Sequence, residues 1–187
     1  MAASIWGDPT VLIGSFNTTL TALKNKCKLF NHMPVFIDDI MLWKPRELNK
    51  FVDMMCSGEA WQNIIITAGE KHLTGVSSHE QVMQIHGKAF NNPEDAEHAH
   101  RLFEKAYGTV GPVYIEGVKT RDVKSDYESL YKILKKVGEN HCHLSHIAVI
   151  CLGDFYGSMF IWNKEEKRAF EQARDLGVAL LMGIIGK

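Results

Sequence analysis

The sequence predicts an α/β fold in which a mostly parallel sheet is followed by a helical C-terminal part. Over residues 1–90, short apolar runs rich in β-forming residues alternate with helical patterns. Such alternation is typical of parallel strands joined by helices. Over residues 91–187 the pattern is helical. We therefore expect two portions, an α/β portion and a helical portion, that meet near residue 90.

Four short apolar segments of the first portion are predicted to be strands. Each is rich in β-branched or aromatic residues and is separated from the next by a polar or helical stretch. The segments are TVLIG (10–14), PVFIDD (34–39), NIIITAG (63–69) and the weaker VMQIHG (82–87). The helical patterns between them indicate crossover connections, which join parallel strands.

Two helices are predicted between the first three strands. The first follows the possible caps Asn17 and Thr18. Its apolar stripe consists of Leu20, Leu23, Cys27 and Phe30. The second begins at Pro45 and ends before Gly58. Its apolar stripe consists of Leu48, Phe51, Val52 and Met55.

The second portion contains three strong helical patterns with capping residues at their ends. They occupy residues 91–108, 122–138 and 163–181. Asn92 and Pro93 open the first pattern, and Gly138 follows the second. Asn163 and Glu166 open the third with the spacing of a capping box.

Composition and charge limit the function classes only weakly. The chain has 187 residues, 45% of them hydrophobic and 23% charged, with a formal net charge of −1. This balance neither indicates nor excludes a nucleic acid partner. The four cysteines show no paired spacing and no signal peptide precedes them, so we expect reduced thiols in the cytoplasm. No apolar run reaches the roughly 18–20 residues of a membrane span, so we expect no membrane partner.

Two adjacent carboxylates follow the apolar residues of the second predicted strand. They belong to Asp38 and Asp39 in the stretch MPVFIDDI. Ligands of open α/β sheets bind at the carboxyl ends of the strands, where one acid can hold Mg²⁺ and a second can polarise an attacking water. In the alternative interpretation, Asp38 caps the next turn and Asp39 is a solvated surface residue.

The third predicted strand also ends in polar groups. Thr67 and Glu70 follow its apolar residues. A neighbouring parallel strand would place them beside the acids, where a side chain could sense the terminal phosphate of a nucleotide. The alternative for Thr67 is a hydroxyl that bonds to the backbone at the strand end.

Two further kinds of sequence feature indicate function less specifically. A histidine-rich segment contains His141, Cys142, His143 and His146. Metal binding would require convergent donors, and no second ligand pair stands out, so the alternative is a helix start with exposed histidines. The basic clusters KNKCK (24–28) and KILKK (132–136) fit solvated helix faces, or phosphate contacts in a helicase ring.

Three stretches of the sequence resemble a known family. They are AASIWGDPTVLIGSFNTTL (2–20), NHMPVFIDDI (31–40) and WQNIIITAGEKHLTG (61–75). They resemble the central part of the ATPase domain in helicase-like proteins of phages and mobile genetic elements, a family catalogued as a domain of unknown function. That family belongs to the P-loop class, close to the AAA+ and RecA-like ATPases. The resemblance covers roughly residues 2–90 and continues more weakly to about residue 160.

The resemblance implies a P-loop NTPase-like sheet that binds ATP with Mg²⁺. Asp38 matches the acid of the Walker B strand that is associated with Mg²⁺, and Asp39 stands where the family usually has a catalytic glutamate. Thr67 or Glu70 matches the sensor of the terminal phosphate. For the intact parent protein, the resemblance implies DNA replication as the process, with DNA as a partner and a homo-oligomeric assembly.

The sequence departs from the family pattern in three places. The phosphate-binding loop is expected before Ala2, and it is missing from these residues. A basic, glycine-rich stretch and an Asn-Arg pair are replaced by CSGEAWQ (56–62) and SSHEQVMQIHG (77–87). We therefore expect the isolated chain to be inactive as an ATPase. The alternative function is a non-catalytic interaction or assembly module with a degenerate NTPase sheet.

Overall fold

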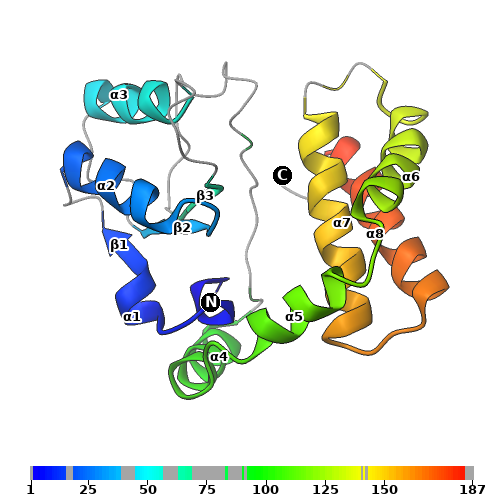
Figure 1. Ribbon diagram of the computed structural model, residues 1–187, viewed down its shortest axis with the longest axis horizontal. Helices are drawn as coiled ribbons and strands as arrows, with labels where there is room; N and C mark the ends of the chain where they lie inside the picture. The colour runs from blue at the N-terminus through cyan, green and yellow to red at the C-terminus, as the bar shows by residue number, and fades with distance from the viewer. Residues whose placement is uncertain are drawn as a thin grey trace. The chain divides into compact units, whose positions relative to one another are not determined.

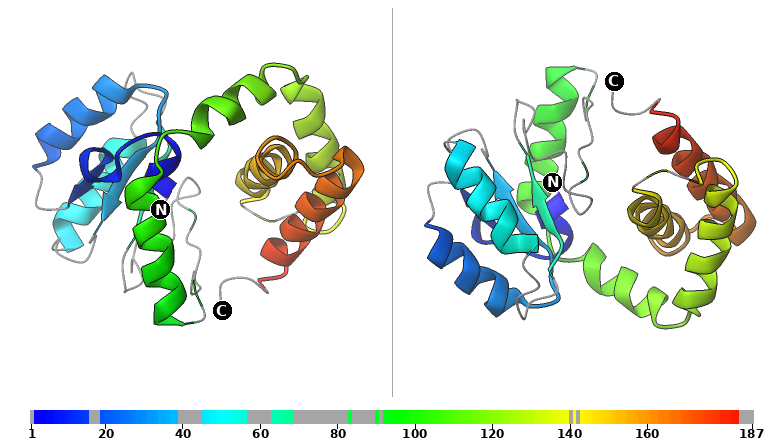
Figure 2. Two further views of the ribbon diagram at one scale, coloured as in Figure 1. Left: turned by 90° about the horizontal axis from the view of Figure 1, so that it is seen from below. Right: turned by 90° about the horizontal axis from the view of Figure 1, so that it is seen from above.

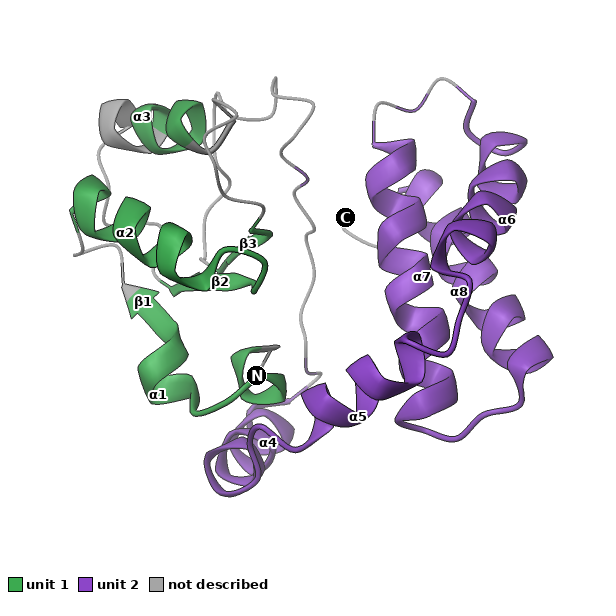
Figure 3. Cartoon of the chain, in the orientation of Figure 1, with its two compact units in different colours: residues 1–82 green, residues 83–187 purple. Residues whose placement is uncertain are grey.

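The computed structural model divides the chain into two compact units. The first unit spans Met1–Val82 and the second spans Met83–Lys187, as coloured in Figure 3. The residues that the structure describes are 2–15, 19–38, 45–56, 63–68, 83, 90, 92–139, 141 and 143–183.

The first unit contains a three-stranded parallel sheet (Figure 1). Its strands are β1 (Ile13–Ser15), β2 (Val35–Asp38) and β3 (Ile65–Thr67), and they are neighbours in that order. The helix α2 (Leu20–Phe30) connects the first two strands, and α3 (Pro45–Cys56) lies between the second and third in the chain. The prediction of a mixed α/β fold with parallel strands and a largely helical remainder is confirmed.

The sheet and its helices enclose one apolar core. Val35 and Ile37 of β2 are buried together with residues from both helices. The helical contributions to this core are Leu23, Cys27, Phe51 and Val52. Because alternate side chains of a strand point to opposite faces, both helices cover the sheet face that carries Val35 and Ile37.

The predicted first strand is partly wrong. Residues Pro9–Leu12 form the short helix α1 after the 3₁₀-helix η1 (Ala2–Ile5), and the strand begins only at Ile13. The carboxylate of Asp8 accepts hydrogen bonds from the Thr10 backbone N–H at 2.8 Å and from its hydroxyl at 2.7 Å. This cap, with proline at the first helical position, favours a helical turn over the extended conformation.

The helix α2 begins after Thr19, and most of the fourth predicted strand lies outside the described residues. Thr19 caps α2, since its hydroxyl accepts from the Ala22 backbone N–H at 3.3 Å. The predicted caps Asn17 and Thr18 lie outside the described residues, as does Gly58. The predicted strand 82–87 lies outside them too, except for Met83.

The second unit is built from helices. They are α4 (Pro93–Lys105), α5 (Val110–Val118), α6 (Val123–Lys135), α7 (Leu144–Phe160) and α8 (Glu166–Leu181). In Figures 1 and 2, α6 and α8 lie alongside α7, and α5 meets it near one end. Among the described residues, no helix is long and apolar enough to cross a membrane.

The helix α7 is the centre of the second core. Its buried residues pack against Leu130 and Leu134 of α6 and against Ala169 and Ala173 of α8. Gly177 permits the close approach of α8, because a Cβ there would lie 2.6 Å from a Leu134 methyl carbon and 2.7 Å from Cys151 Sγ. A side chain of any size at this position would require the neighbouring helices to move apart.

The predicted start of α4 is confirmed, and the predicted start of α8 is wrong. Asn92 caps α4 as predicted, and its side-chain oxygen accepts from the Asp95 backbone N–H at 2.8 Å. The predicted capping box at Asn163 is wrong, because α8 begins after Glu165 and Asn163 adopts a left-handed φ of 51° in the preceding turn. The backbone N–H of Lys164 instead donates to the carbonyl of Ser158 at 3.0 Å, which directs this turn back onto α7.

Candidate functional site

The carboxyl ends of the three strands meet at one edge of the sheet. Asp38 is the last residue of β2, and its register partner on β1 is Ser15, the last residue of that strand. Thr67 is the last residue of β3 and pairs with Ile37. The Ala68 backbone N–H donates to the Ile37 carbonyl at 3.2 Å, which extends the pairing one residue further. This edge is where open parallel sheets bind their ligands.

Asp38 marks an abrupt change from buried to exposed along β2. Val35, Phe36 and Ile37 are all buried, whereas Asp38 is exposed. The Asp38 side chain is thus accessible to solvent, while its backbone is held by pairing on the sheet. Mg²⁺ favours such sites, because it retains several of its waters and binds one or two carboxylates.

Thr67 reaches the same edge from the neighbouring strand, but on the other face. Its register partner is Ile37, and register partners in a parallel sheet point to the same face. Asp38 follows Ile37 and points to the opposite face. The structure therefore brings Asp38 and Thr67 to one edge without directing them to the same side. The other two predicted site residues, Asp39 and Glu70, lie outside the described residues.

The second unit contains a polar network that sequence reasoning did not identify. The guanidinium of Arg121 donates to Asp126 Oδ2 at 3.0 Å and to Glu166 Oε1 at 2.8 Å. The hydroxyl of Tyr156 donates to the same Asp126 oxygen at 2.8 Å. Arg121 also lies over the Phe155 ring, 5.6 Å from its centroid. The network thus joins the α5–α6 turn to α6, α7 and α8.

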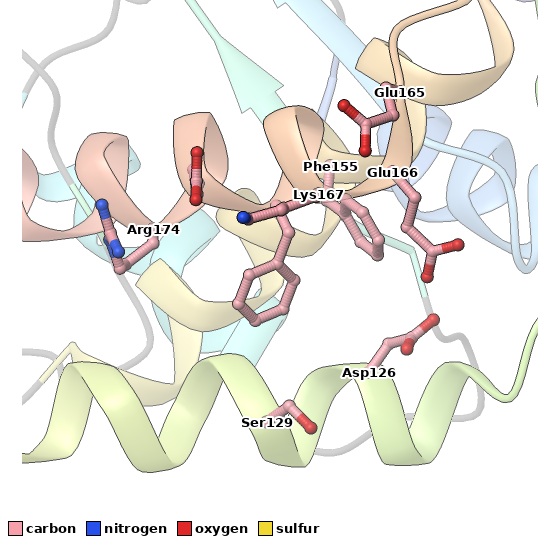
Figure 4. A pocket seen from close by; sticks show the side chains of 9 residues that line it. Asp126, Ser129, Phe155, Glu165, Glu166, Lys167 and Arg174 are labelled. Atoms are coloured by element: carbon pink, nitrogen blue, oxygen red, sulfur yellow. The ribbon is translucent and has the colours of Figure 1, made fainter.

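This network borders an open depression of about 640 Å³. Figure 4 shows that Asp126 on α6 and Glu166 on α8 face each other across it, with Phe155 between the two helices. The hydrogen bonds to Glu166 and Asp126 raise the pKa of Arg121 above its usual value. Burial and the bond to Asp126 raise the pKa of Tyr156. Both groups hold their protons firmly, so the network suits cross-linking of helices better than acid–base chemistry.

No local sequence signal could have identified this network. Arg121 and Glu166 are separated by 45 residues, and neither stands in a recognisable motif. The packing of α6 and α8 against α7 and against each other brings them together. The same holds for Tyr156, whose helix α7 is apolar on all sides and so shows no amphipathic pattern.

The second polar group of this unit centres on Gln172 in α8. Its amide nitrogen donates to Asp154 Oδ2 at 3.0 Å and to the buried Ser158 hydroxyl at 3.1 Å, both on α7. Its amide oxygen accepts from the Lys164 ammonium group. Every polar atom of the Gln172 side chain therefore has a partner, and the group ties α8 and its preceding turn to α7.

Comparisons with known proteins find no relative of this chain. No protein-family model matches the chain, and searches of curated proteins and of solved structures find no match either. Among the described residues, no group of three or more His, Cys, Asp or Glu side chains is arranged to hold a metal ion.

Proposed function

We propose that this chain carries the Mg²⁺-binding strand and the neighbouring sensor strand of a P-loop class ATPase. The parent protein in this proposal is a helicase or replication protein of a phage or mobile element. The observation that supports the proposal is the exposed Asp38 at the carboxyl end of a buried central strand, with parallel strands on both sides. This is the position at which nucleotide-hydrolysing sheets hold their metal-associated acid.

Each predicted site residue has one role in the proposed mechanism. Asp38 holds Mg²⁺ through its water shell. Asp39 orients the attacking water, and Thr67 or Glu70 senses the terminal phosphate of ATP. The phosphate-binding loop of the parent supplies most contacts to the nucleotide, so the chain alone binds Mg-ATP weakly. The proposed partners of the whole protein are DNA and further copies of itself.

The test compares two carboxylates in a full-length parent that includes its phosphate loop. Asp38→Asn should weaken Mg²⁺-dependent ATP binding and lower turnover together, because the metal contributes to both. Asp53→Asn removes an exposed carboxylate from the outer side of α3 and serves as the matched control. Parental ATP turnover in the Asp38→Asn variant would show that this carboxylate does not hold the catalytic metal, and the proposal would fail.

A second candidate is a non-catalytic assembly module. The observation that favours it is a row of three apolar residues on the sheet face opposite α2 and α3. Ile13, Phe36 and Ile66 are register partners across the three strands. Phe36 is buried, but Ile13 is 37% exposed and Ile66 is 42% exposed. In this alternative, Ile66→Glu should impair assembly of the parent, and Asp38→Asn should leave every measured activity unchanged.

A further inference from the structure

Three histidine rings stand in a row at the start of α7. The ring centroids of His141 and His143 are 5.9 Å apart, and those of His143 and His146 are 5.8 Å apart. All three side chains are half-buried, so the expectation of exposed histidines is wrong. His143 is the residue that precedes the first turn of α7, and its carbonyl accepts from the Ile147 backbone N–H at 2.9 Å. The His143 backbone is therefore hydrogen-bonded into the first turn of α7.

Two of the three rings have a buried nitrogen without a hydrogen bond. The Nδ1 atoms of His143 and His146 are shielded from solvent and have no partner among the residues that the structure describes. The Nδ1 atom of His141 differs, because it accepts from the His143 backbone N–H at 3.2 Å. An imidazole nitrogen that accepts a hydrogen bond leaves the ring proton on the other nitrogen. His141 is thus committed to the backbone, whereas the other two Nδ1 atoms remain available.

We propose that His143 and His146 bind one divalent transition-metal ion through their Nδ1 atoms. Buried polar atoms require partners, and imidazole nitrogens prefer Zn²⁺, Cu²⁺ or Ni²⁺ over the oxygen-seeking Mg²⁺ and Ca²⁺. Because both Nδ1 atoms are shielded from solvent, the two rings must turn to admit the ion together with its water ligands, and the described residues offer no third ligand. This site lies in the second unit and does not depend on the proposed ATPase function.

The ring separation is near that of two imidazoles that share one ion, but wider. A Zn–N distance of about 2.0–2.1 Å places the ion about 3.2 Å from the centre of each ring, so two rings of one tetrahedral site have centres about 5 Å apart. The observed separation of 5.8 Å is slightly wider than this value. Binding of one ion by both Nδ1 atoms therefore requires the two imidazoles, which lie on adjacent turns of backbone, to rotate toward each other.

Two properties limit the affinity of the site. The positive end of the α7 dipole lies at the same place and disfavours a cation there. Two protein ligands also hold an ion less tightly than the four ligands of a closed structural zinc site. Binding requires unprotonated nitrogens, so it weakens on acidification. We therefore expect a reversible site that is emptied by a chelator without unfolding of the chain.

The experiment is a titration of the full chain, with calorimetry for ZnCl₂ and visible absorption for CoCl₂. One ion per chain should bind, and the visible spectrum of Co²⁺ should change on binding, because two imidazole nitrogens replace part of its water shell. Binding should be lost in both His143→Asn and His146→Gln. It should persist in His32→Gln, which changes an exposed histidine of the first unit. Circular dichroism of each variant verifies that α7 is still folded.

Two outcomes would overturn the proposal. The first is the absence of saturation by Zn²⁺ or Co²⁺ at millimolar concentration in the unchanged protein. The second is unaltered binding in both folded variants, which would place any bound ion elsewhere. Because the titration does not measure ATP binding, failure of this site and failure of the proposed ATPase function remain distinguishable.

Discussion

The Nη2 atom of Arg121 lies 2.8 Å from Glu166 Oε1, and this contact joins the α5–α6 turn to the first turn of α8. The same guanidinium pairs with Asp126, and the Arg121 and Asp126 side chains are only 21% and 20% exposed. Partly buried charge pairs of this kind cannot lose one member without leaving the other poorly solvated. Arg121 is therefore expected to contribute more to stability than the surface ion pairs of the chain.

Arg121→Ala should lower the free energy of unfolding of the second unit by about 1–3 kcal/mol, because two carboxylates lose their charged donor. The matched control is Arg174→Ala. Arg174 pairs with Asp175 at 2.7 Å, but these side chains are 42% and 68% exposed. Surface pairs of this kind contribute about 0–1 kcal/mol. Urea unfolding followed by circular dichroism measures both changes, and equal losses would contradict the special role of Arg121.

Tyr156→Phe should destabilise the same unit by about 1–2 kcal/mol, because Asp126 loses a hydrogen bond in a buried setting. Tyr156 is 1% exposed and its hydroxyl lies 2.8 Å from Asp126 Oδ2. In the Arg121→Ala background the cost of Tyr156→Phe should change, since the two donors share one carboxylate. A double-mutant cycle measures this coupling, and strict additivity would show that the contacts act independently.

Gly177→Ala and Gly153→Ala should have opposite effects on stability. A Cβ at Gly177 would lie 2.6 Å from Leu134 and 2.7 Å from Cys151, so overpacking should cost about 1–3 kcal/mol. Gly153 has open space within 4 Å of a built Cβ and lies inside α7, so alanine there should stabilise by about 0.5–1 kcal/mol through helix propensity. Thermal unfolding of both variants compares them directly, and destabilisation by both would contradict the packing described for these helices.

Cys151 should make the second unit less stable at alkaline pH. Burial, with a smaller effect from Asp154, raises the pKa of its thiol from 9.0 to about 11. Because the folded-state pKa is raised, the stabilising contribution is complete below pH 9 and is lost as the pH rises through about 11. Melting temperatures across this interval should fall more steeply for the unchanged protein than for Cys151→Ala.

Alkylation provides an independent measure of the same thiol. Below pH 9, Cys151 should remain unmodified in the folded protein and react readily after unfolding, because the thiolate is the nucleophile and Cys151 is fully buried. Cys27 should show the same protection, since burial raises its pKa as well. Peptide mass mapping assigns the modified residues, and rapid labelling of Cys151 in the folded state would contradict its burial.

Asp39→Asn should separate ATP binding from hydrolysis in the full-length parent. In the proposed mechanism Asp39 orients the attacking water, so it should be dispensable for Mg-ATP binding, whereas its loss should reduce turnover by about 10²–10⁴-fold. Asp39→Glu should retain or raise turnover, because it restores the longer side chain of the resembled family. Binding isotherms and steady-state rates for the two variants test these roles, and loss of binding in Asp39→Asn would assign this residue to the metal instead.

The sequence by itself determined the features that depend on neighbours in the chain. The apolar run before Asp38 identified β2 and the exposed acid at its end, because a buried strand has consecutive apolar residues in the sequence. Asn92 and Pro93 likewise located the start of α4, since a cap bonds to a backbone group only three residues away. Local patterns also gave wrong predictions. The Asp8 cap makes Thr10–Leu12 helical where a strand was predicted, and Asn163 lies in a left-handed turn where a helix cap was predicted.

Only the tertiary structure decided which distant residues meet. The register that pairs Asp38 with Ser15 and Ile37 with Thr67 places the two predicted site residues on opposite faces, and no periodicity within one strand contains that information. The bond between Arg121 and Glu166 exists only because α6 and α8 pack against α7 and against each other. The physical reason is that local propensities act over one or two turns of chain, whereas register and interhelical contacts arise from burial of complementary surfaces far apart in sequence.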